Sequence, residues 1–235
     1  MPTPPDLLAA MLRSDSGRPR VTFYEDTPGA TGGERIELSA RVLANWVSKA
    51  ANALQDEWDL APRSRVRLAL PPHWRSLYWA MATWSVGATV VLDASPHDLL
   101  VTDDRGLLDP DETPGVLVTL AALARSADGP VPAGVMDEAR ELATYADQFT
   151  PWDEPAPTET ALLAEGATTA FDGLVPQATW PSGARVHTAA PTLAEVLPTA
   201  LAAWALDGSV VLSRGPEPVA GRADRCLSEG VTTSV

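Results

Sequence analysis

The clearest pattern of apolar and polar positions lies in residues 65–93. Residues 65–70 alternate as in a strand, and two prolines then stop the pattern because proline supplies no donor to a strand ladder. Apolar side chains recur at helical spacing on both sides of residues 74–84. Residues 88–92 form a continuous apolar run, which is typical of an interior parallel strand. The pattern predicts a strand, a buried helix, a tight turn at Gly87 and a second strand.

The same pattern recurs 120 positions further on, over residues 185–213. In this alignment Val66 corresponds to Val186, and Trp84 to Trp204. A strand, a helix and a second strand joined by a short return imply parallel pairing and a right-handed crossover. We therefore expect an α/β fold of two pseudo-repeated strand–helix–strand lobes with mainly parallel sheets. In each lobe the tryptophan is expected to plug the helix onto its sheet, and in the second lobe Gly208 is expected to turn the chain.

Shorter patterns precede the first unit. Residues 6–13 are expected to be helical, and the alternating residues 21–25 and 34–38 predict a hairpin with a long tip. Ser39 is then expected to cap an amphipathic helix whose apolar positions extend over residues 42–58.

The pattern is weaker between the two units. Residues 99–102 and 116–120 predict strands, and residues 135–146 predict a helix. Short apolar segments on both sides of Gly166 predict a reduced hairpin.

The best candidate linker is TPWDEPAPT at residues 150–158, with three prolines in nine residues. On this basis we expect a first lobe over residues 1–149, with the N-terminal hairpin and amphipathic helix. A second, shorter lobe is expected over residues 159–235.

Composition narrows the possible functions. A net charge of −14 argues against nucleic acid as a partner, because protein surfaces that bind nucleic acid are basic. Lys49 and Cys226 are the only lysine and the only cysteine, so the sequence indicates neither a disulfide nor a cysteine metal cluster. A reducing, cytoplasmic location fits this pattern. The sequence has no uninterrupted run of about 18 apolar residues, so it predicts no membrane span. Residues 1–20 do not resemble a signal peptide.

Several segments resemble the N-terminal part of the adenylate-forming superfamily, which comprises acyl-CoA synthetases, luciferases and peptide-synthetase adenylation domains. Residues 63–66 take the place of that family's GDRV turn, residues 70–72 that of its strand end in LPN, and residues 87–93 that of GAVVVPLDP. Residues 184–186 and 208–212 resemble a later family segment. The resemblance covers about two thirds of the chain and implies a truncated, divergent relative with the fold of the N-terminal subdomains.

The departures from the family pattern bear on activity. The family's phosphate loop, a Ser/Thr/Gly-rich turn ending in Pro-Lys-Gly, should lie between the two repeats, yet residues 100–184 contain no match and no lysine. Residues 27–33, TPGATGG, imitate its composition but are expected to form only a turn. Ala194 stands where many synthetases carry a histidine near the acyl pocket. The resemblance therefore implies the fold without the adenylation chemistry.

Ligands of open α/β sheets bind at the carboxyl ends of the strands. His73 and Trp74 follow the first strand of one unit, and Thr192 and Leu193 follow its counterpart in the other. We predict these four residues as a ligand-binding site, with no catalytic residue, no cofactor and no metal.

The first functional hypothesis is a non-catalytic module that binds an acyl, aryl or CoA-type ligand or a protein partner. One alternative is an enzyme with a rebuilt site at the strand ends, and another is one half of a split acyl-CoA synthetase. The sequence leaves the ligand and the oligomeric state open.

Overall fold

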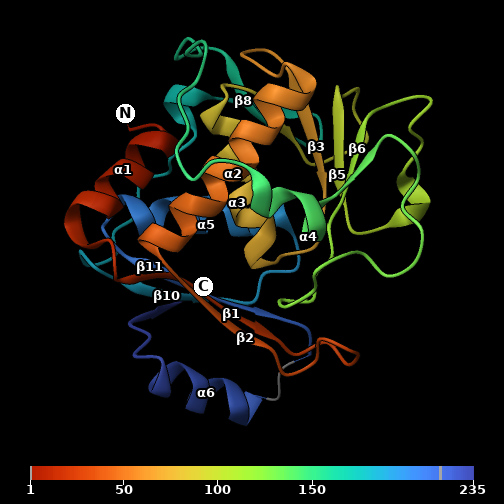
Figure 1. The fold of residues 1–235 in the computed structure, drawn as a ribbon. Helices are drawn as coiled ribbons and strands as arrows, with labels where there is room; N and C mark the ends of the chain where they lie inside the picture. The colour runs from red at the N-terminus through yellow and green to blue at the C-terminus, as the bar shows by residue number, and fades with distance from the viewer. Residues whose placement is uncertain (1, 217–218) are drawn as a thin grey trace. The chain divides into compact units, whose positions relative to one another are not determined.

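The computed structural model describes residues 2–216 and 219–235, which form two compact units (Figure 1). The first unit comprises Met1–Leu43, Pro71–Trp74 and Val175–Val235. The second comprises Ala44–Leu70 and Arg75–Leu174.

A five-stranded sheet forms the first unit, in the order β12-β10-β11-β1-β2. All neighbours in it are parallel except the β1–β2 hairpin. Helices α1 (Pro4–Asp15) and α5 (Leu193–Ala205) lie on one face of this sheet, and α6 (Val219–Ser228) lies on the other (Figure 1). The strands are β1 (Pro19–Glu25), β2 (Arg35–Ser39), β10 (Arg185–Thr188), β11 (Ser209–Arg214) and β12 (Thr233–Ser234).

A seven-stranded sheet forms the second unit, in the order β7-β6-β5-β3-β4-β8-β9. Only β8 and β9 are antiparallel. The strands are β3 (Arg65–Ala69), β4 (Thr89–Val91), β5 (Leu99–Thr102), β6 (Gly115–Leu117), β7 (Val135–Asp137), β8 (Thr160–Ala164) and β9 (Ala167–Ala170). The helices are α2 (Ala40–Trp58), α3 (Trp74–Ser85) and α4 (Glu138–Glu141), of which α2 and α3 begin in the first unit.

The predicted repeat is confirmed down to its register. Arg65 pairs with Thr89 in the parallel β3–β4 ladder, and Arg185 pairs with Ser209, 120 positions on, in β10–β11. Trp84 and Trp204, the equivalent tryptophans of the two repeats, are both buried at the end of their helices. Both indole N–H groups donate to a backbone carbonyl of the next strand along the sheet, Trp84 to Ala161 at 2.8 Å and Trp204 to Arg20 at 3.1 Å.

The two hairpins of the chain pair with the repeat that is remote from them in sequence. β1 and β2 extend the sheet beside β11, and β8 and β9 extend it beside β4. The order β10-β11-β1-β2 thus matches the order β3-β4-β8-β9. Because each hairpin joins the other repeat, the compact units do not coincide with lobes at residues 1–149 and 159–235. The proline-rich residues 150–158 also lie in the second unit, where Trp152 N donates to Gln55 of α2.

The turns between helix and return strand differ in the two repeats. Gly87 has φ +81°, and its counterpart by position, Asp207, has φ +56°. Asp207 holds this left-handed conformation while its carboxylate pairs with Arg20 at 2.7 Å. The prediction that Gly208 makes the turn is therefore wrong. Gly208 is required for space, since a Cβ there would lie 2.3 Å from Ala184 O.

Three local predictions differ from the structure, and one helix was not predicted. The helix expected over residues 135–146 is instead β7, α4 and the 3₁₀ turn η2 (Leu142–Thr144), because Val135–Asp137 pairs with β6. The strand expected over residues 116–120 ends at Leu117. The first helix is longer than expected and is capped by Thr3. α6 was not predicted.

Replacing either indole N–H donor is expected to cost about 1–3 kcal/mol of unfolding free energy, because a buried carbonyl loses its partner. Trp84→Phe and Trp204→Phe should therefore be destabilised by similar amounts in urea unfolding. Trp152→Phe is the control, since that side chain is 57% exposed, and it should change stability by less than about 0.5 kcal/mol. A loss confined to one of the two buried tryptophans would contradict their equivalence.

Candidate functional site

The carboxyl edge of the seven-stranded sheet is the candidate site. β5, β6 and β7 are parallel neighbours, so their carboxyl ends at Thr102, Leu117 and Asp137 lie at one edge. Irregular loops follow β5 and β6, as the wide excursions beside them in Figure 1 show, and α4 directly follows β7. Open α/β sheets bind their ligands at such an edge.

Two cavities lie in these loops. The larger, of about 470 Å³, is lined by residues 126–127, 129–135, 137 and 140. Pro130, Val131, Pro132 and Val135 give it apolar wall, and Arg140 supplies a cationic group. The smaller, of about 240 Å³, lies against residues 117–120 and includes Asp103 and Arg105. Ala127 lines both cavities, so they are adjacent.

A buried clamp holds the loops behind these cavities. Arg75 and Tyr78, in the first turns of α3, both contact the carboxylate of Glu138, which directly follows β7. The Arg75–Glu138 ion pair is 2.8 Å long, and both side chains are at most 4% exposed. Arg75 also donates to Ala121 O, in the loop after β6. One arginine therefore fixes the segments that follow two different strands, α4 after β7 and the loop after β6.

Burial dominates the acid–base properties of the clamp. It raises the pKa of Glu138 because it disfavours the charged carboxylate, and Arg75 opposes this effect. Burial also raises the pKa of Tyr78 well above its usual value. The tyrosine is therefore a neutral donor to Glu138, and the arrangement fits a structural role.

Asp137 closes the wall of the larger cavity. Its two carboxylate oxygens accept from Ala127 N at 3.1 and 3.0 Å, and its side chain is buried. Arg105 reaches across to Asp128 O. These contacts tie the loop after β6 to the strand end and to the loop after β5, so the cavity has fixed walls.

Lys49, the only lysine in the sequence, forms hydrogen bonds with backbone oxygens of the second unit. Its ammonium donates to Ala143 O at 2.9 Å and Tyr145 O at 2.5 Å, and it pairs with Asp147 at 2.8 Å. These contacts fasten the segment after α4 to α2. The lysine thus has a packing role in this structure.

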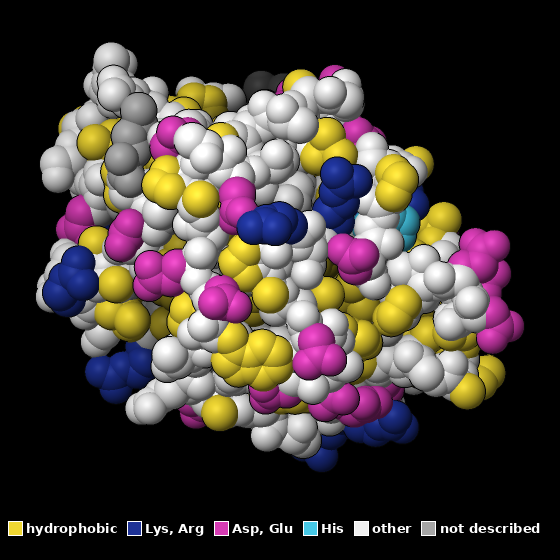
Figure 2. Space-filling view, turned by 90° about the horizontal axis from the view of Figure 1, so that it is seen from above, with side chains coloured by type: hydrophobic (Ala, Val, Ile, Leu, Met, Phe, Trp, Pro, Cys, Tyr) yellow, Lys and Arg dark blue, Asp and Glu magenta, His cyan; other side chains and the backbone are white. Residues whose placement is uncertain are grey.

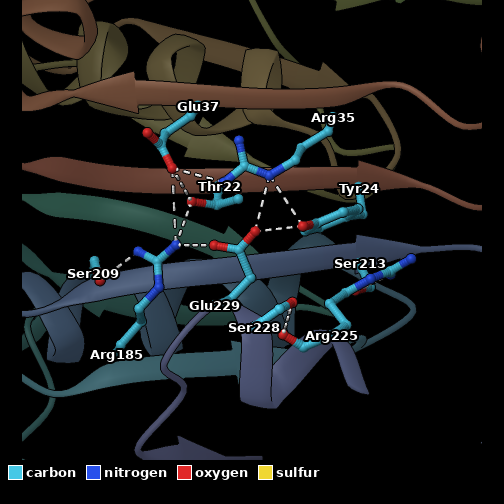
Figure 3. Close-up of polar contacts among 10 residues, drawn as sticks. All are labelled: Thr22, Tyr24, Arg35, Glu37, Arg185, Ser209, Ser213, Arg225, Ser228 and Glu229. Atoms are coloured by element: carbon cyan, nitrogen blue, oxygen red, sulfur yellow. Dashed lines mark hydrogen bonds and ion pairs between the residues drawn. The ribbon is translucent and has the colours of Figure 1, made fainter. Parts of the chain in front are cut away.

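The face of the five-stranded sheet beneath α6 carries a second polar cluster (Figure 3). Glu229 lies just after α6, and its carboxylate meets Arg35 at 2.9 Å and Arg185 at 2.5 Å. Tyr24 OH donates to the same carboxylate. Burial alone would raise the pKa of Glu229, but hydrogen bonds from Arg35, Tyr24 and Arg185 outweigh it and lower the pKa to about 2.

This shift predicts acid sensitivity of the Glu229 contacts. A carboxylate with a depressed folded-state pKa contributes stability above its unfolded value of 4.5, and the contribution is lost as pH falls toward 2. The groups facing it are Arg35, Arg185 and Tyr24, with Glu37 beside them. Wild type should lose more unfolding free energy than Glu229→Gln between about pH 5 and about pH 3 in urea titrations. Equal losses would contradict the assignment.

On the face shown in Figure 2, acidic side chains are scattered among hydrophobic and a few basic groups. The charge of −14 is therefore not concentrated at one point of that face.

Comparison with solved structures identifies the fold. The acyl-CoA synthetase of Brucella canis matches 99% of this chain with a TM-score of 0.73 at 13% identity. Klebsiella oxytoca NpsA in complex with 3-hydroxyanthranilyl-AMSN matches 100% of it, with a TM-score of 0.69 at 16% identity. N-terminal domains solved on their own match it as well. This chain has the fold of the N-terminal part of adenylate-forming enzymes. The predicted fold class is thereby confirmed.

The match covers only part of these larger proteins. This chain spans 47% of the B. canis enzyme and 47% of the K. oxytoca chain. A TIGR03089 family protein of Mycobacterium tuberculosis is 39% identical over 160 residues, which are 64% of this chain and 63% of that protein. No family model matches the sequence. No helix in the described residues is long and apolar enough to cross a membrane.

Within this adenylate-forming fold, the four predicted ligand-binding residues belong to the first unit. His73 is buried, with its ring 4.4 Å from that of Phe23 and 5.5 Å from that of Trp74. Trp74 is 3% exposed, Thr192 donates to Glu195 at 2.7 Å, and Leu193 is buried at the start of α5. Their role as a ligand site stays a prediction.

Sequence reasoning missed the loop cavities and the clamp. Glu138 falls inside the helix that the sequence predicts over residues 135–146, and no site residue is predicted in the segment after β6. A signal did exist, because Asp137 and Glu138 directly follow an apolar β-branched start at Val135. The pairing of β7 with β6 depends on contacts across the sheet, which local periodicity does not reveal.

Proposed function

We propose that this chain is a non-catalytic binding module that uses the adenylate-forming fold to hold a small acyl or aryl ligand. The cavity of about 470 Å³ beside β7, lined mainly by the loop between β6 and β7, carries this proposal. Its volume lies within the roughly 300–1,000 Å³ of small-molecule sites. The buried Arg75–Glu138 pair and the Asp137 contacts hold its walls in place without a ligand.

The lining is more polar than apolar, which suits a small organic acid that can form hydrogen bonds. Prolines and valines supply contact area, and Arg140 at the rim supplies a partner for a carboxylate. Arg140 is 64% exposed and pairs with Glu141 at 2.7 Å, so it is accessible at the surface. K. oxytoca NpsA, with the same fold, was solved with a 3-hydroxyanthranilyl ligand. Its aryl group supports the aryl class as the first one to test.

The non-catalytic part of the proposal rests on two observations, which are the contacts of Lys49 and the residues that form the β8–β9 turn. Adenylation requires cationic groups that neutralise the departing pyrophosphate. Lys49 is engaged by two backbone carbonyls and Asp147. Between the two repeats, the β8–β9 hairpin closes through Glu165 and Gly166, both at positive φ, and so presents an acidic side chain at its turn.

Binding of benzoate, anthranilate and octanoate tests the site. A ligand at 100 times its Kd stabilises the folded state by about 2.7 kcal/mol. For a chain of this size we therefore expect the melting temperature to rise by about 5–10 °C. Isothermal titration calorimetry would then give the affinity of each acid.

Val131→Arg is the site variant, because Val131 lines the cavity and is not part of the clamp. It should abolish the thermal shift and leave the ligand-free melting temperature within about 2 °C of wild type. Val42→Arg, at a valine 40% exposed on α2, is the matched control and should bind as wild type does. Undiminished binding by Val131→Arg would place the site elsewhere.

A further inference from the structure

The face of the five-stranded sheet beneath α6 presents donors that converge on one point (Figure 3). Arg35 extends from β2, Tyr24 from β1 and Arg185 from β10. β10 and β2 are separated in the sheet by β11 and β1. Two guanidinium groups from non-adjacent strands therefore face the same small volume, and a phenolic hydroxyl lies beside them.

A carboxylate of the chain itself fills that volume. Glu229 Oε1 accepts from Arg35 Nε at 2.9 Å and from Tyr24 OH, while Oε2 accepts from Arg185 at 2.5 Å. Thr22 Oγ1 accepts from the same Arg185 nitrogen at 2.9 Å. The side chain of Glu229 is 9% exposed. The donors thus surround both oxygens of one planar carboxylate.

The helix before this carboxylate makes polar contacts with the sheet through Arg225. Arg225 of α6 donates to Asp26 at 2.6 and 2.8 Å and stacks over the Tyr24 ring at 3.9 Å. Leu227 of the same helix is 82% exposed. Glu229 follows this helix directly and precedes β12, which pairs with β10. The short segment between α6 and β12 therefore places the carboxylate among the strand donors.

Charge and hydrogen bonding both show that the strands would retain an anion preference without Glu229. Arg35 and Arg185 face Glu37 and Glu229, so removal of Glu229 leaves one net positive charge among these groups. Arg185 Nε is buried with no hydrogen-bond partner among the described residues. A buried donor without a partner costs about 1–3 kcal/mol, which an additional acceptor would recover.

We propose that Arg35, Arg185 and Tyr24 form a carboxylate-binding cradle, that Glu229 is its internal occupant, and that a small exogenous carboxylate takes its place when Glu229 withdraws. Arg35 and Arg185 each hold one oxygen of the planar Glu229 carboxylate, so a small carboxylate is the ligand class that the internal occupant indicates. This site lies in the five-stranded unit and is independent of the proposed cavity in the seven-stranded unit.

Chemical rescue tests the cradle. Glu229→Ala leaves the donors in place, and acetate, benzoate and inorganic phosphate are titrated separately against chloride at matched ionic strength. We expect acetate to raise the melting temperature of Glu229→Ala saturably and to give a calorimetric binding isotherm. Wild type, whose cradle is filled, should show a response at least about 10-fold weaker at equal acetate. If the alanine variant does not fold, Glu229→Ser, which also empties the cradle, provides the same test.

The double variant Arg185→Ala/Glu229→Ala isolates the cradle from general ionic effects. It should show no more response to acetate than to chloride. An equal acetate response in the single and double variants, or none in the single variant, would overturn the proposal. Tighter binding of phosphate than of acetate would overturn the assignment to carboxylates.

Discussion

Replacing Glu138 with alanine is expected to destabilise the protein by about 3–5 kcal/mol, because Arg75 would be left as a buried charge without its counter-ion. The Arg75–Glu138 pair is 2.8 Å long, and the side chains are 4% and 1% exposed. Tyr78 OH would lose its acceptor in the same change. Both losses fall on groups that water cannot solvate, so their effect on the folded state should be large.

Arg140→Ala is the matched control for this loss. Arg140 also pairs with a glutamate, Glu141 at 2.7 Å, but the two side chains are 64% and 39% exposed. Surface pairs contribute about 0–1 kcal/mol, so this variant should unfold within about 1 kcal/mol of wild type. Urea unfolding of both variants gives the comparison. A cost for Glu138→Ala no larger than that for Arg140→Ala would show that the clamp does not fix the loops.

Gly208→Ala is expected to cost about 3 kcal/mol or more, because the new methyl group has no room. Its Cβ would lie 2.3 Å from Ala184 O and 2.7 Å from Ala203 O, both rigid backbone atoms. Those atoms belong to the entry of β10 and the end of α5, so relief would require the return turn to open.

Two substitutions provide the comparison for Gly208→Ala. Gly221, in α6, has nothing within 4 Å of its Cβ position, and Gly221→Ala should stabilise by up to about 1 kcal/mol. Ala88 occupies the position equivalent to Gly208 in the first repeat, and Ala88→Gly should cost only about 1 kcal/mol. Thermal and urea unfolding would rank the three variants. A neutral Gly208→Ala would mean that the turn is wider than the structure shows.

The sequence was sufficient to predict elements whose stabilising contacts are local or periodic. The repeat, the hairpin after the first helix and the buried helix ending at Trp84 all follow from spacing, and the structure has each of them. The family resemblance, carried by the order of these elements, agrees with the fold of the solved neighbours. Local pattern and tertiary fold agree here because residues 65–70 alternate and residues 88–92 are a continuous apolar run, as the observed β3 and β4 require.

Features that depend on pairing between distant segments could not be predicted in this way. Nothing in residues 21–38 indicates that this hairpin pairs beside β11 rather than beside its sequence neighbours. The clamp joins Arg75 to Glu138, 63 residues apart, and the cradle joins Tyr24 to Glu229, 205 residues apart. The sequence around Asp207 does not indicate its positive φ, because the pairing with Arg20 that accompanies this conformation joins distant segments. α6 was missed because none of its residues 221–228, for which the structure describes burial, is buried.

The central claim is that this fold binds an organic acid without adenylating it. The most direct measurement is ATP–pyrophosphate exchange in the presence of a carboxylic acid whose binding has first been established by calorimetry on the same protein. We predict saturable binding of at least one acyl or aryl acid and exchange no faster than with the Val131→Arg variant. Exchange that requires the acid and is lost in Val131→Arg would contradict the claim and show that this chain is an adenylating enzyme.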